Sequence, residues 1–554
     1  MSALITTQLG EAVPPAPRHA ITVHMPGWDT VERFADNPSA MIASFKSVYP
    51  RMKPHRDIDT LAQAVLKLAP GQDQACYLFS SLQSAQECVA YSISSRRDNG
   101  VDKTPIEPDK IQIRAFVAKN HFFAVLFPAE KRLVVSGFWA TPGVGVSSRF
   151  AEANLEHLDK VREVKVEEVT TDETVFQGSA HQMIRQRVIS LLQRAPIPHH
   201  AQPTLSADDV YLYPTGMASI YKPYTYITNH YEDTAVLYGM AFMNTISAFE
   251  EFGDSHKFFG LGTDQDLQAL EDFLRQERTQ GRKVSSIWAE FPANPILVTP
   301  DLEKLRELAD EYDALFIIDD TLGSFANIDV VGYTDMLVTS LTKSFNGYAD
   351  AIGGSAVINR SSRRYPELKA LFDKLHIPEL FVDDAKAIEV NSRDYLTRSA
   401  KLNSNAAAIM QYLTRCADDP ASAVRCVYYP SVNPSGHHYK RFMRPVTPEF
   451  VPGYGCLMSI EFESMAATKA FYDALNVHKG PHLGAPFTLA FAYVVCAYKN
   501  RLDWAAQFGL KPTQIRISAG LEDTGTLVED FRLAVEAANR AHQAQRHANL
   551  PLGS

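Results

Sequence analysis

The sequence predicts an α/β protein built around a mostly parallel sheet, and three observations support that class. From about residue 150 to 390, short apolar runs alternate with amphipathic helical patterns, which is typical of a parallel sheet flanked by helices. Several of these runs end in polar or acidic residues, as expected where buried strands present side chains at their carboxyl ends. A second alternation of strands and helices continues to about residue 545, which indicates a smaller α/β domain.

The composition is that of a globular protein with no nucleic-acid or membrane partner. Hydrophobic residues make up 45% and charged residues 21% of the 554 residues, and that length allows several domains. The formal net charge of −10 argues against a surface for nucleic acid or for an anionic membrane. No apolar stretch approaches the ~20 residues that are needed to span a bilayer.

The cysteines and histidines predict neither disulfides nor a metal site. The six cysteines are scattered without CxxC spacing, so we expect reduced thiols and a cytoplasmic location. The adjacent pairs His199-His200 and His437-His438 do not share a helix face, and no HExxH motif occurs. No charged segment followed by an apolar run opens the chain, so secretion is not expected.

We divide the chain into three segments. Residues 1–145 form an N-terminal extension whose first 20 residues are rich in proline and alanine and are expected to be mobile. Three strand patterns suggest that the extension has a small sheet of its own, at residues 111–118, 122–127 and 131–139. We expect the extension to serve interaction or oligomer stability, with a regulatory site as the less favoured alternative. Residues 146–390 form the large domain and residues 391–548 the small C-terminal domain.

The two later segments show the remaining elements in order. Helical patterns lie at residues 150–158, 181–192, 301–312, 401–414, 466–472 and 527–545. Strand patterns lie at residues 235–240, 286–290, 314–319, 336–340, 456–462 and 514–518.

A lysine follows the strand pattern at residues 336–340 in an unusual setting. Hydroxyls of Ser340 and Thr342 lie three residues and one residue before Lys343, and a turn that contains glycine follows it. A lysine at the end of a buried strand can lose its proton and attack a carbonyl, and the hydroxyls have the spacing expected for a nearby phosphate. Pyridoxal phosphate (PLP) combines a carbonyl with a phosphate and is carried as a lysine Schiff base. A surface lysine after a core strand is the alternative, so the prediction depends on other segments.

Three other segments fit the same cofactor. Asp319 ends an apolar run, where its carboxylate could keep a pyridine nitrogen protonated, or could instead cap a helix. Thr215, Gly216 and Met217 open a helical pattern, where free N–H groups and the helix dipole attract a phosphate. Tyr238 ends another apolar run and could stack on a planar ring, although a core tyrosine is the alternative.

Together the segments resemble the PLP-dependent enzymes of cysteine and methionine metabolism, which include cystathionine γ-synthases, cystathionine lyases and O-acylhomoserine sulfhydrylases. Six motifs occur in the family's order over roughly residues 145–545, and their order is more specific than any single motif. The matching segments are Thr215-Gly216-Met217, Tyr238-Gly239-Met240, Glu290-Phe-Pro-Ala-Asn294-Pro295, Asp319-Asp320-Thr321, Ser340-Leu-Thr342-Lys343 and Gln514-Ile-Arg516-Ile-Ser518. The resemblance is strongest to the long fungal cystathionine γ-synthase type, which includes relatives that carry out γ-replacement in natural-product pathways.

The resemblance implies a fold, a cofactor and an assembly. The fold is that of aspartate aminotransferase (fold type I), the cofactor is PLP, and the protein is a homodimer or homotetramer with its site at a subunit interface. Lys343 and Tyr238 are the expected catalytic residues, and Arg516 is expected to hold the α-carboxylate of an amino-acid substrate. The cofactor-binding residues that the resemblance implies are Thr215, Gly216, Met217, Tyr238, Asn294, Asp319, Thr321, Ser340, Thr342 and Lys343.

Two segments depart from the family's pattern. Relatives have a Tyr-x-Arg pair that reaches the phosphate of the neighbouring subunit, and the best candidate here is Ser147-Ser148-Arg149, which lacks the tyrosine. Relatives read Ser-Leu-Gly beside the reactive lysine, where this chain has His482-Leu483-Gly484. An altered residue at the expected catalytic centre suggests an altered second substrate. His482 could orient or deprotonate that substrate, or it could simply replace serine as a hydrogen-bond donor.

The expected reaction is γ-replacement on an O-acyl-L-homoserine. Lys343 would move protons among the substrate carbons, which requires its pKa to lie well below that of free lysine. Loss of the acyl group leaves a vinylglycine-type electrophile, to which a nucleophile adds at Cγ. That nucleophile is cysteine, giving cystathionine, or a β-keto acid or ester as in natural-product relatives, and His482 favours the second. A cystathionine lyase and a catalytically silent PLP-fold subunit are the alternatives. The long extension argues against the lyase, and intact Lys343, Asp319 and Arg516 argue against the silent subunit.

Overall fold

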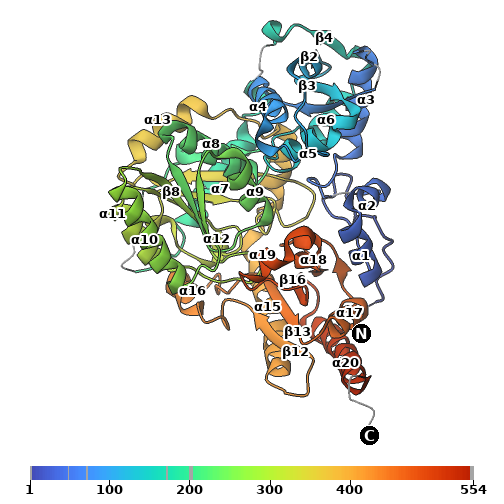
Figure 1. Cartoon of the computed structure of the whole chain (residues 1–554), viewed down its shortest axis with the longest axis vertical. Helices are drawn as coiled ribbons and strands as arrows, with labels where there is room; N and C mark the ends of the chain where they lie inside the picture. The colour runs from blue at the N-terminus through green and yellow to red at the C-terminus, as the bar shows by residue number, and fades with distance from the viewer. Residues whose placement is uncertain are drawn as a thin grey trace.

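The computed structural model describes residues 3–47, 49–69, 71, 73–169, 173–198 and 204–548, and it places one sheet in each third of the chain (Figure 1). The pair His199-His200 and the last six residues lie outside the described residues. No helix in the described part of the chain is long and apolar enough to cross a membrane.

The first sheet belongs to the N-terminal extension and is antiparallel, with the order β1-β3-β2-β4. Its strands are β1 (Gln74–Phe79), β2 (Gln112–Val117), β3 (His121–Pro128) and β4 (Arg162–Val164). The helices around it are α3 (Arg56–Leu68), α4 (Leu82–Ile93), α5 (Arg132–Ala140) and α6 (Ser148–Leu155). Because β4 pairs with β2, this sheet extends past the boundary that we predict at residue 145, and we propose that the extension ends after β4.

Two expectations about the extension are wrong. Residues 131–139 are not a strand, because Val134, Val135 and Phe138 follow a helical spacing and bury one face of α5. The segment before residue 20 is not mobile where the structure describes it. Val13 is 1% exposed, and the backbone N–H of Gly10 donates to the carbonyl of His24 at 2.8 Å.

Residues 3–55, which we call the N-terminal arm, run along the C-terminal domain. The arm contains α1 (Trp28–Asp36) and α2 (Pro38–Ser44), which Figure 1 shows beside α17 and α18 and below the first sheet. The backbone N–H of Met25 donates to the carbonyl of Lys479 at 3.0 Å, and the rings of Trp28 and Tyr472 meet edge to face. These contacts fix the arm against a domain that lies more than 400 residues later in the chain.

The second sheet has seven strands in the order β5-β11-β10-β9-β8-β6-β7, and only β11 is antiparallel to its neighbours. This confirms the predicted mostly parallel sheet. The strands are β5 (Val210–Tyr213), β6 (Thr234–Tyr238), β7 (His256–Phe259), β8 (Val284–Glu290), β9 (Leu315–Asp319), β10 (Met336–Thr339) and β11 (Gly354–Ile358). Its helices are α7 (Ser179–Leu192), α8 (Ala218–Tyr231), α9 (Met243–Phe252), α10 (Asp264–Thr279), α11 (Leu302–Glu311), α12 (Ser324–Asn327), α13 (Tyr365–Leu375) and α14 (Val382–Asn391).

Alternate residues of these strands enter two different cores, one on each face of the sheet. Leu237 and Ile317 belong to one core, whereas Val236, Tyr238 and Ile318 belong to the other. This is the pattern of strands that are buried on both faces, and it explains why the strands read as continuous apolar runs. The parallel strands also bring their carboxyl ends to one edge, where the functional side chains are expected.

The third sheet, in the C-terminal domain, has the order β12-β13-β16-β15-β14. Its strands are β12 (Val424–Tyr428), β13 (Leu457–Phe462), β14 (His478–Lys479), β15 (Leu489–Phe491) and β16 (Gln514–Ser518). The helices of this domain are α15 (Tyr395–Ala417), α16 (Gly436–Phe442), α17 (Met465–Ala474), α18 (Tyr493–Tyr498), α19 (Leu502–Ala506) and α20 (Thr524–Ala548). The central strand β16 brings Arg516 toward the edge of the large sheet.

Candidate active site

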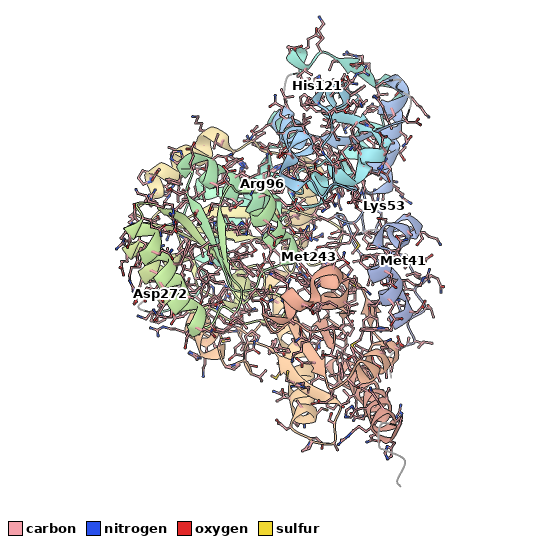
Figure 2. All side chains as sticks on the ribbon, in the orientation of Figure 1. Met41, Lys53, Arg96, His121, Met243 and Asp272 are labelled. Atoms are coloured by element: carbon pink, nitrogen blue, oxygen red, sulfur yellow. The ribbon has the colours of Figure 1, made fainter. Side chains whose placement is uncertain are left out.

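A cavity of about 400 Å³ lies where the carboxyl edge of the large sheet meets the C-terminal domain and the N-terminal arm. Met243, one of its lining residues, is labelled near the centre of the molecule in Figure 2, with Met41 and Lys53 of the arm region to one side. Ten of the residues that the sequence predicts for the site line this cavity: Thr215, Gly216, Met217, Asn294, Asp319, Thr321, Ser340, Thr342, Lys343 and Arg516. Tyr238, Arg149 and His482 do not line it.

The start of α8 forms one end of the cavity. Thr215 and Gly216 lie just before the first turn of the helix, so their backbone N–H groups are at the positive end of the helix dipole. Gly216 packs against Ser340, the residue that follows strand β10. A Cβ at position 216 would stand 3.0 Å from the Cα of Ser340. The chain therefore keeps a cradle of N–H and hydroxyl groups here that any larger residue would fill. The Thr342 hydroxyl is held beside it by hydrogen bonds with the backbone of Gly353 at 3.1 Å.

Two carboxylates lie on the floor of the cavity, at the ends of β8 and β9. Glu290 and Asp319 are paired in register across these strands. Glu290 accepts hydrogen bonds from the backbone N–H groups of Phe242 at 2.6 Å and Asn294 at 3.0 Å. Burial and the neighbouring Asp319 raise the pKa of Glu290 to about 8. Burial also raises the pKa of Asp319, against the hydrogen bonds that it receives from Thr321. A cationic group bound next to Asp319 would stabilise its charged form.

Lys343 contacts a tyrosine of the N-terminal arm. Its Nζ donates a hydrogen bond to the hydroxyl of Tyr49 at 2.7 Å. Burial lowers the pKa of Lys343, and the Tyr49 hydroxyl partly opposes that shift. Burial alone would raise the pKa of Tyr49, but the positive charges of Lys343, Arg51 and Arg516 outweigh it and lower that pKa to about 8. The hydrogen bond and the lowered pKa values of both groups allow the pair to exchange a proton.

Arg516 is the cation on the C-terminal side of the cavity, and it is 4% exposed. Its guanidinium donates to the Asn294 side-chain oxygen at 3.3 Å and to the carbonyl of Pro481 at 2.6 Å. It also lies over the ring of Tyr493, 4.6 Å from the centroid. Because its own contacts are all neutral, Arg516 has charge available for a bound carboxylate.

His482 lies behind the cavity wall and is 1% exposed. Burial, with the charges of Lys343 and Arg516, lowers its pKa well below the usual value, so the ring is neutral. Neither ring nitrogen has a hydrogen-bond partner among the described residues, and the ring lies 6.0 Å from that of Tyr49. His482 is thus placed to contact the Lys343–Tyr49 pair, but not to form the cavity surface.

The structure places Tyr238 away from the cavity, which corrects its expected stacking role. Tyr238 shares the sheet face of Val236, and its hydroxyl donates to the carbonyl of Thr263 at 2.8 Å. The aromatic ring that this connection supplies to the cavity is Phe242, four residues later. The tyrosine that meets Lys343 is Tyr49.

The Tyr-x-Arg pair also lies elsewhere than expected. Arg149 forms ion pairs with Asp350 and Asp384, and it lines a smaller cavity of about 50 Å³. Tyr49-Pro50-Arg51 has the same Tyr-x-Arg spacing and lines the large cavity. The spacing was a usable signal, but it occurs in the extension, where the sequence shows no chemistry. Arg51 lines both cavities, as does Thr215, so it stands at the cradle end.

The residues fit PLP, the cofactor that the sequence implies. The cradle of Gly216, Ser340 and Thr342 would hold its phosphate, Asp319 its ring nitrogen, and Lys343 its carbonyl carbon. The fit is supported by the close approach of Gly216 to the Ser340 side chain, which a Cβ would prevent, and by the lowered pKa of Lys343. The fold and the site therefore define a PLP-dependent enzyme.

The comparisons with known proteins give the family. Residues 199–536 match the Cys/Met metabolism PLP-dependent enzyme family, and residues 57–147 match the N-terminal domain of fungal trans-sulfuration enzymes. The chain belongs to this family, as its resemblance predicts. Strands β1, β2 and β3 of the first sheet lie within the second match, and β4 lies after it.

Several relatives are similar over nearly the whole chain. The cystathionine gamma-synthase-like enzyme iboG1 of Amanita muscaria is 32% identical, with 96% of this chain and 98% of the relative covered. The alanine racemase ungC of Aspergillus violaceofuscus is also 32% identical, over 97% and 98%. The cystathionine gamma-synthase of Neurospora crassa is 28% identical, over 97% and 99%. The protein is therefore a cystathionine γ-synthase-like PLP enzyme.

A solved structure supports the fold. The cystathionine gamma synthase of Xanthomonas oryzae pv. oryzae is similar with a TM-score of 0.53 at 23% identity, over 66% of this chain and 87% of that one. This agrees with the predicted fold class.

One group of side chains with metal-ligand chemistry occurs among the described residues, and it lies outside the large cavity. His19, His55 and Asp57 bring their ligand atoms within 4.8 Å of one another. Arg18 already pairs with Asp57, and His19 contacts Ser148 and Glu152. These contacts give the three residues a role in joining the arm to α3 and α6.

Proposed function

We propose that the enzyme catalyses γ-replacement on an O-acyl-L-homoserine, with a carbon nucleophile such as a β-keto acid or ester as the second substrate. The observation that carries the proposal is the hydrogen-bonded pair of Lys343 and Tyr49, which lies in one cavity with Arg516. A buried amine of lowered pKa and a nearby cation for a carboxylate are the groups that an α-amino acid requires at such a site.

The residues divide the work as follows. Arg516, oriented by Asn294, binds the α-carboxylate and fixes the amino acid in one pose. PLP, when bound, withdraws electrons from Cα and makes its C–H bond acidic. The Lys343 amine accepts the Cα proton and returns protons in later steps, and Tyr49 shares that proton through its hydrogen bond. Asp319 holds the positive charge of the cofactor ring.

The overall reaction balances without a further reactant. The Cγ–O bond of the O-acylhomoserine breaks, and the acyl group leaves as a carboxylate. A bond forms between Cγ and the nucleophilic carbon, which loses one proton to the medium. Among the described residues that line the cavity, the cations are Arg51, Lys343 and Arg516, and none is left over to bind a second carboxylate on the acyl group. We therefore propose an acyl group without a carboxylate, such as acetyl.

His482 is the departure from the family's pattern that favours a nucleophile other than cysteine, because its neutral ring lies behind the cavity wall, 6.0 Å from the Tyr49 ring, where it can position the Lys343–Tyr49 pair. Cystathionine synthesis from cysteine is the alternative within the same reaction class, and a cystathionine lyase or a catalytically silent subunit are the others. We also propose a cytoplasmic homodimer or homotetramer, with the site near a subunit interface.

A second candidate function is racemisation of an amino acid. The Lys343–Tyr49 pair supplies two acid–base groups at one site, as removal and return of the Cα proton require, and one similar relative is named as an alanine racemase. Racemisation needs no second substrate and would leave the acyl group in place.

One experiment separates these functions. The PLP-loaded protein is incubated in D₂O with L-cystathionine, and separately with O-acetyl-L-homoserine, alone and with cysteine, ethyl acetoacetate or acetoacetate. The products are identified by mass and by chiral chromatography. Adducts that have lost acetate support γ-replacement and name the nucleophile. Deuterated D-amino acid with acetate retained supports racemisation, and 2-oxobutanoate from cystathionine supports the lyase. No change with any of these compounds would refute the enzymatic proposals.

A further inference from the structure

The N-terminal arm forms an apolar wall of the cavity, opposite the groups that bind the amino acid. Phe34 of α1, Pro38 and Ile42 of α2, and Met52 line the cavity from the arm. Phe34 is 6% exposed, and Ile42 and Met52 are half-buried. Cys496 and Ala497 of α18 line the cavity too and extend this surface. We call the four arm residues the arm wall.

The charged side chains that line the cavity lie outside the arm wall, although one of them, Arg51, is an arm residue that precedes Met52. They are Arg51, Glu290, Asp319, Lys343 and Arg516. Glu290 and Asp319 lie on the floor, and Lys343 and Arg516 serve the amino acid. Arg51 stands at the cradle end, with its guanidinium 4.5 Å from the centroid of the Phe242 ring.

With Arg51 assigned to the cradle, no charged pair remains for a second amino acid among the described residues that line the cavity. A cysteine bound beside O-acylhomoserine would bring its own carboxylate and ammonium groups into the cavity. Placing both against the arm wall would remove them from water without partners, which is strongly unfavourable. An uncharged molecule with alkyl groups would instead gain from the same contact.

We propose that the arm wall selects the second substrate, and that this substrate is a neutral, enolisable carbonyl compound with an alkyl chain, of the β-keto ester class. The proposal rests on the proposed γ-replacement and deepens it by naming the substrate class and the residues that select it. The reacting carbon faces Lys343, and the alkyl chain lies on Phe34, Ile42 and Met52.

The test compares two charged variants of one helix. Ile42→Glu places a carboxylate in the arm wall, at a half-buried position that a longer side chain can occupy. Ala43→Glu makes the same change at the adjacent, exposed position of α2 and is the matched control. Both variants and the wild type are loaded with PLP and given O-acetyl-L-homoserine with ethyl acetoacetate, ethyl 3-oxohexanoate or L-cysteine.

Two quantities are measured. The first is the ratio of transfer product to 2-oxobutanoate, the product of elimination without transfer. The second is calorimetric binding of each ester to the loaded enzyme without O-acetyl-L-homoserine. For the wild type we expect ethyl 3-oxohexanoate to exceed ethyl acetoacetate by roughly tenfold in both, since each buried CH₂ contributes ~0.8 kcal/mol. In Ile42→Glu that preference and the transfer ratio should fall about tenfold, whereas Ala43→Glu should match the wild type.

The outcomes are distinct. Equal use and binding of the two esters, equal effects of the two variants, or preferred transfer to cysteine would overturn the arm-wall proposal. If the wild type releases no acetate at all, the proposed γ-replacement fails. The binding measurement then tests the arm-wall proposal by itself. A preference for the longer ester that is lost only in Ile42→Glu supports the proposal, and the absence of such a preference refutes it.

Discussion

Replacing Tyr49 with phenylalanine should shift the pH dependence of the enzyme in a defined direction. The substitution keeps the ring and removes the hydroxyl that accepts a hydrogen bond from Lys343 at 2.7 Å. That hydroxyl raises the pKa of Lys343, so its loss lowers the pKa of the amine further. A hydrogen bond to a charged group contributes ~1.5–3 kcal/mol, which corresponds to about one to two pH units at 1.36 kcal/mol per unit.

The sign follows from the role of the amine as a base. Lys343 must be neutral to accept the Cα proton, so activity falls as pH drops through its pKa, and this acid limb should move to lower pH in Tyr49→Phe. The wild type should also show a titration near pH 8, where Tyr49 ionises, and the variant should lack it. The net rate at pH 7.5 should fall about tenfold, because the shared proton has lost one of its two sites.

The assay is acetate release from O-acetyl-L-homoserine by the PLP-loaded enzyme, measured as kcat/KM from pH 6 to 10. Tyr231→Phe is the control, since it removes a hydroxyl that accepts from Arg364 far from the cavity. An unchanged profile in Tyr49→Phe, or an acid limb that moves to higher pH, would refute the reasoning.

Four further predictions concern the other site residues. Lys343→Ala should abolish turnover and the absorbance band that borohydride removes, and turnover near the wild-type rate would refute the site. Asp319→Asn should lower kcat by orders of magnitude with the thermal melting curve unchanged, whereas a severalfold loss would assign the residue to helix capping. Arg516→Ala should raise the KM of every α-amino acid substrate steeply, and an unchanged KM would remove it from the site. His482→Ser should shift the adduct ratio toward cysteine by about tenfold to a hundredfold, since one hydrogen bond is worth ~1–3 kcal/mol. Elimination should persist in this variant. A parallel loss of both reactions would give His482 a structural role.

The large sheet and most of its edge could be predicted from the sequence, because local patterns determine them. Buried parallel strands read as apolar runs, and the residue that follows each run lies at the shared edge, which is why Asp319, Ser340 and Lys343 come together. The cradle at Gly216 follows from a turn that opens a helix, which is equally local.

The errors come from orientation and from distance along the chain. Tyr238 ends a strand as predicted, but the sequence does not say which face of the sheet receives the cofactor. Side chains alternate between the two faces along a strand, and Tyr238 lies on the face opposite the cavity. Tyr49 meets Lys343 across 294 residues, through an arm whose path depends on contacts such as that of Met25 with Lys479. No local pattern encodes such a contact. The segment at residues 131–139 has two short apolar runs, 133–135 and 138–139, and runs this short do not distinguish a strand from a helix.

The arm gives this enzyme a division of labour that affects how it can change. Apart from Tyr49 and Arg51 of the arm, the groups that activate the amino acid come from residues 215–516, and they are spread over two domains. The arm wall comes from residues 34–52, a single short stretch at the beginning of the chain. Exchange of residues 34–42 between homologous enzymes, which leaves Tyr49 and Arg51 in place, would alter the partner of the reaction while the bond-breaking half remains intact. The arm is thus a natural unit for recombination, in evolution or in the laboratory, toward new amino acids built on the same four-carbon electrophile.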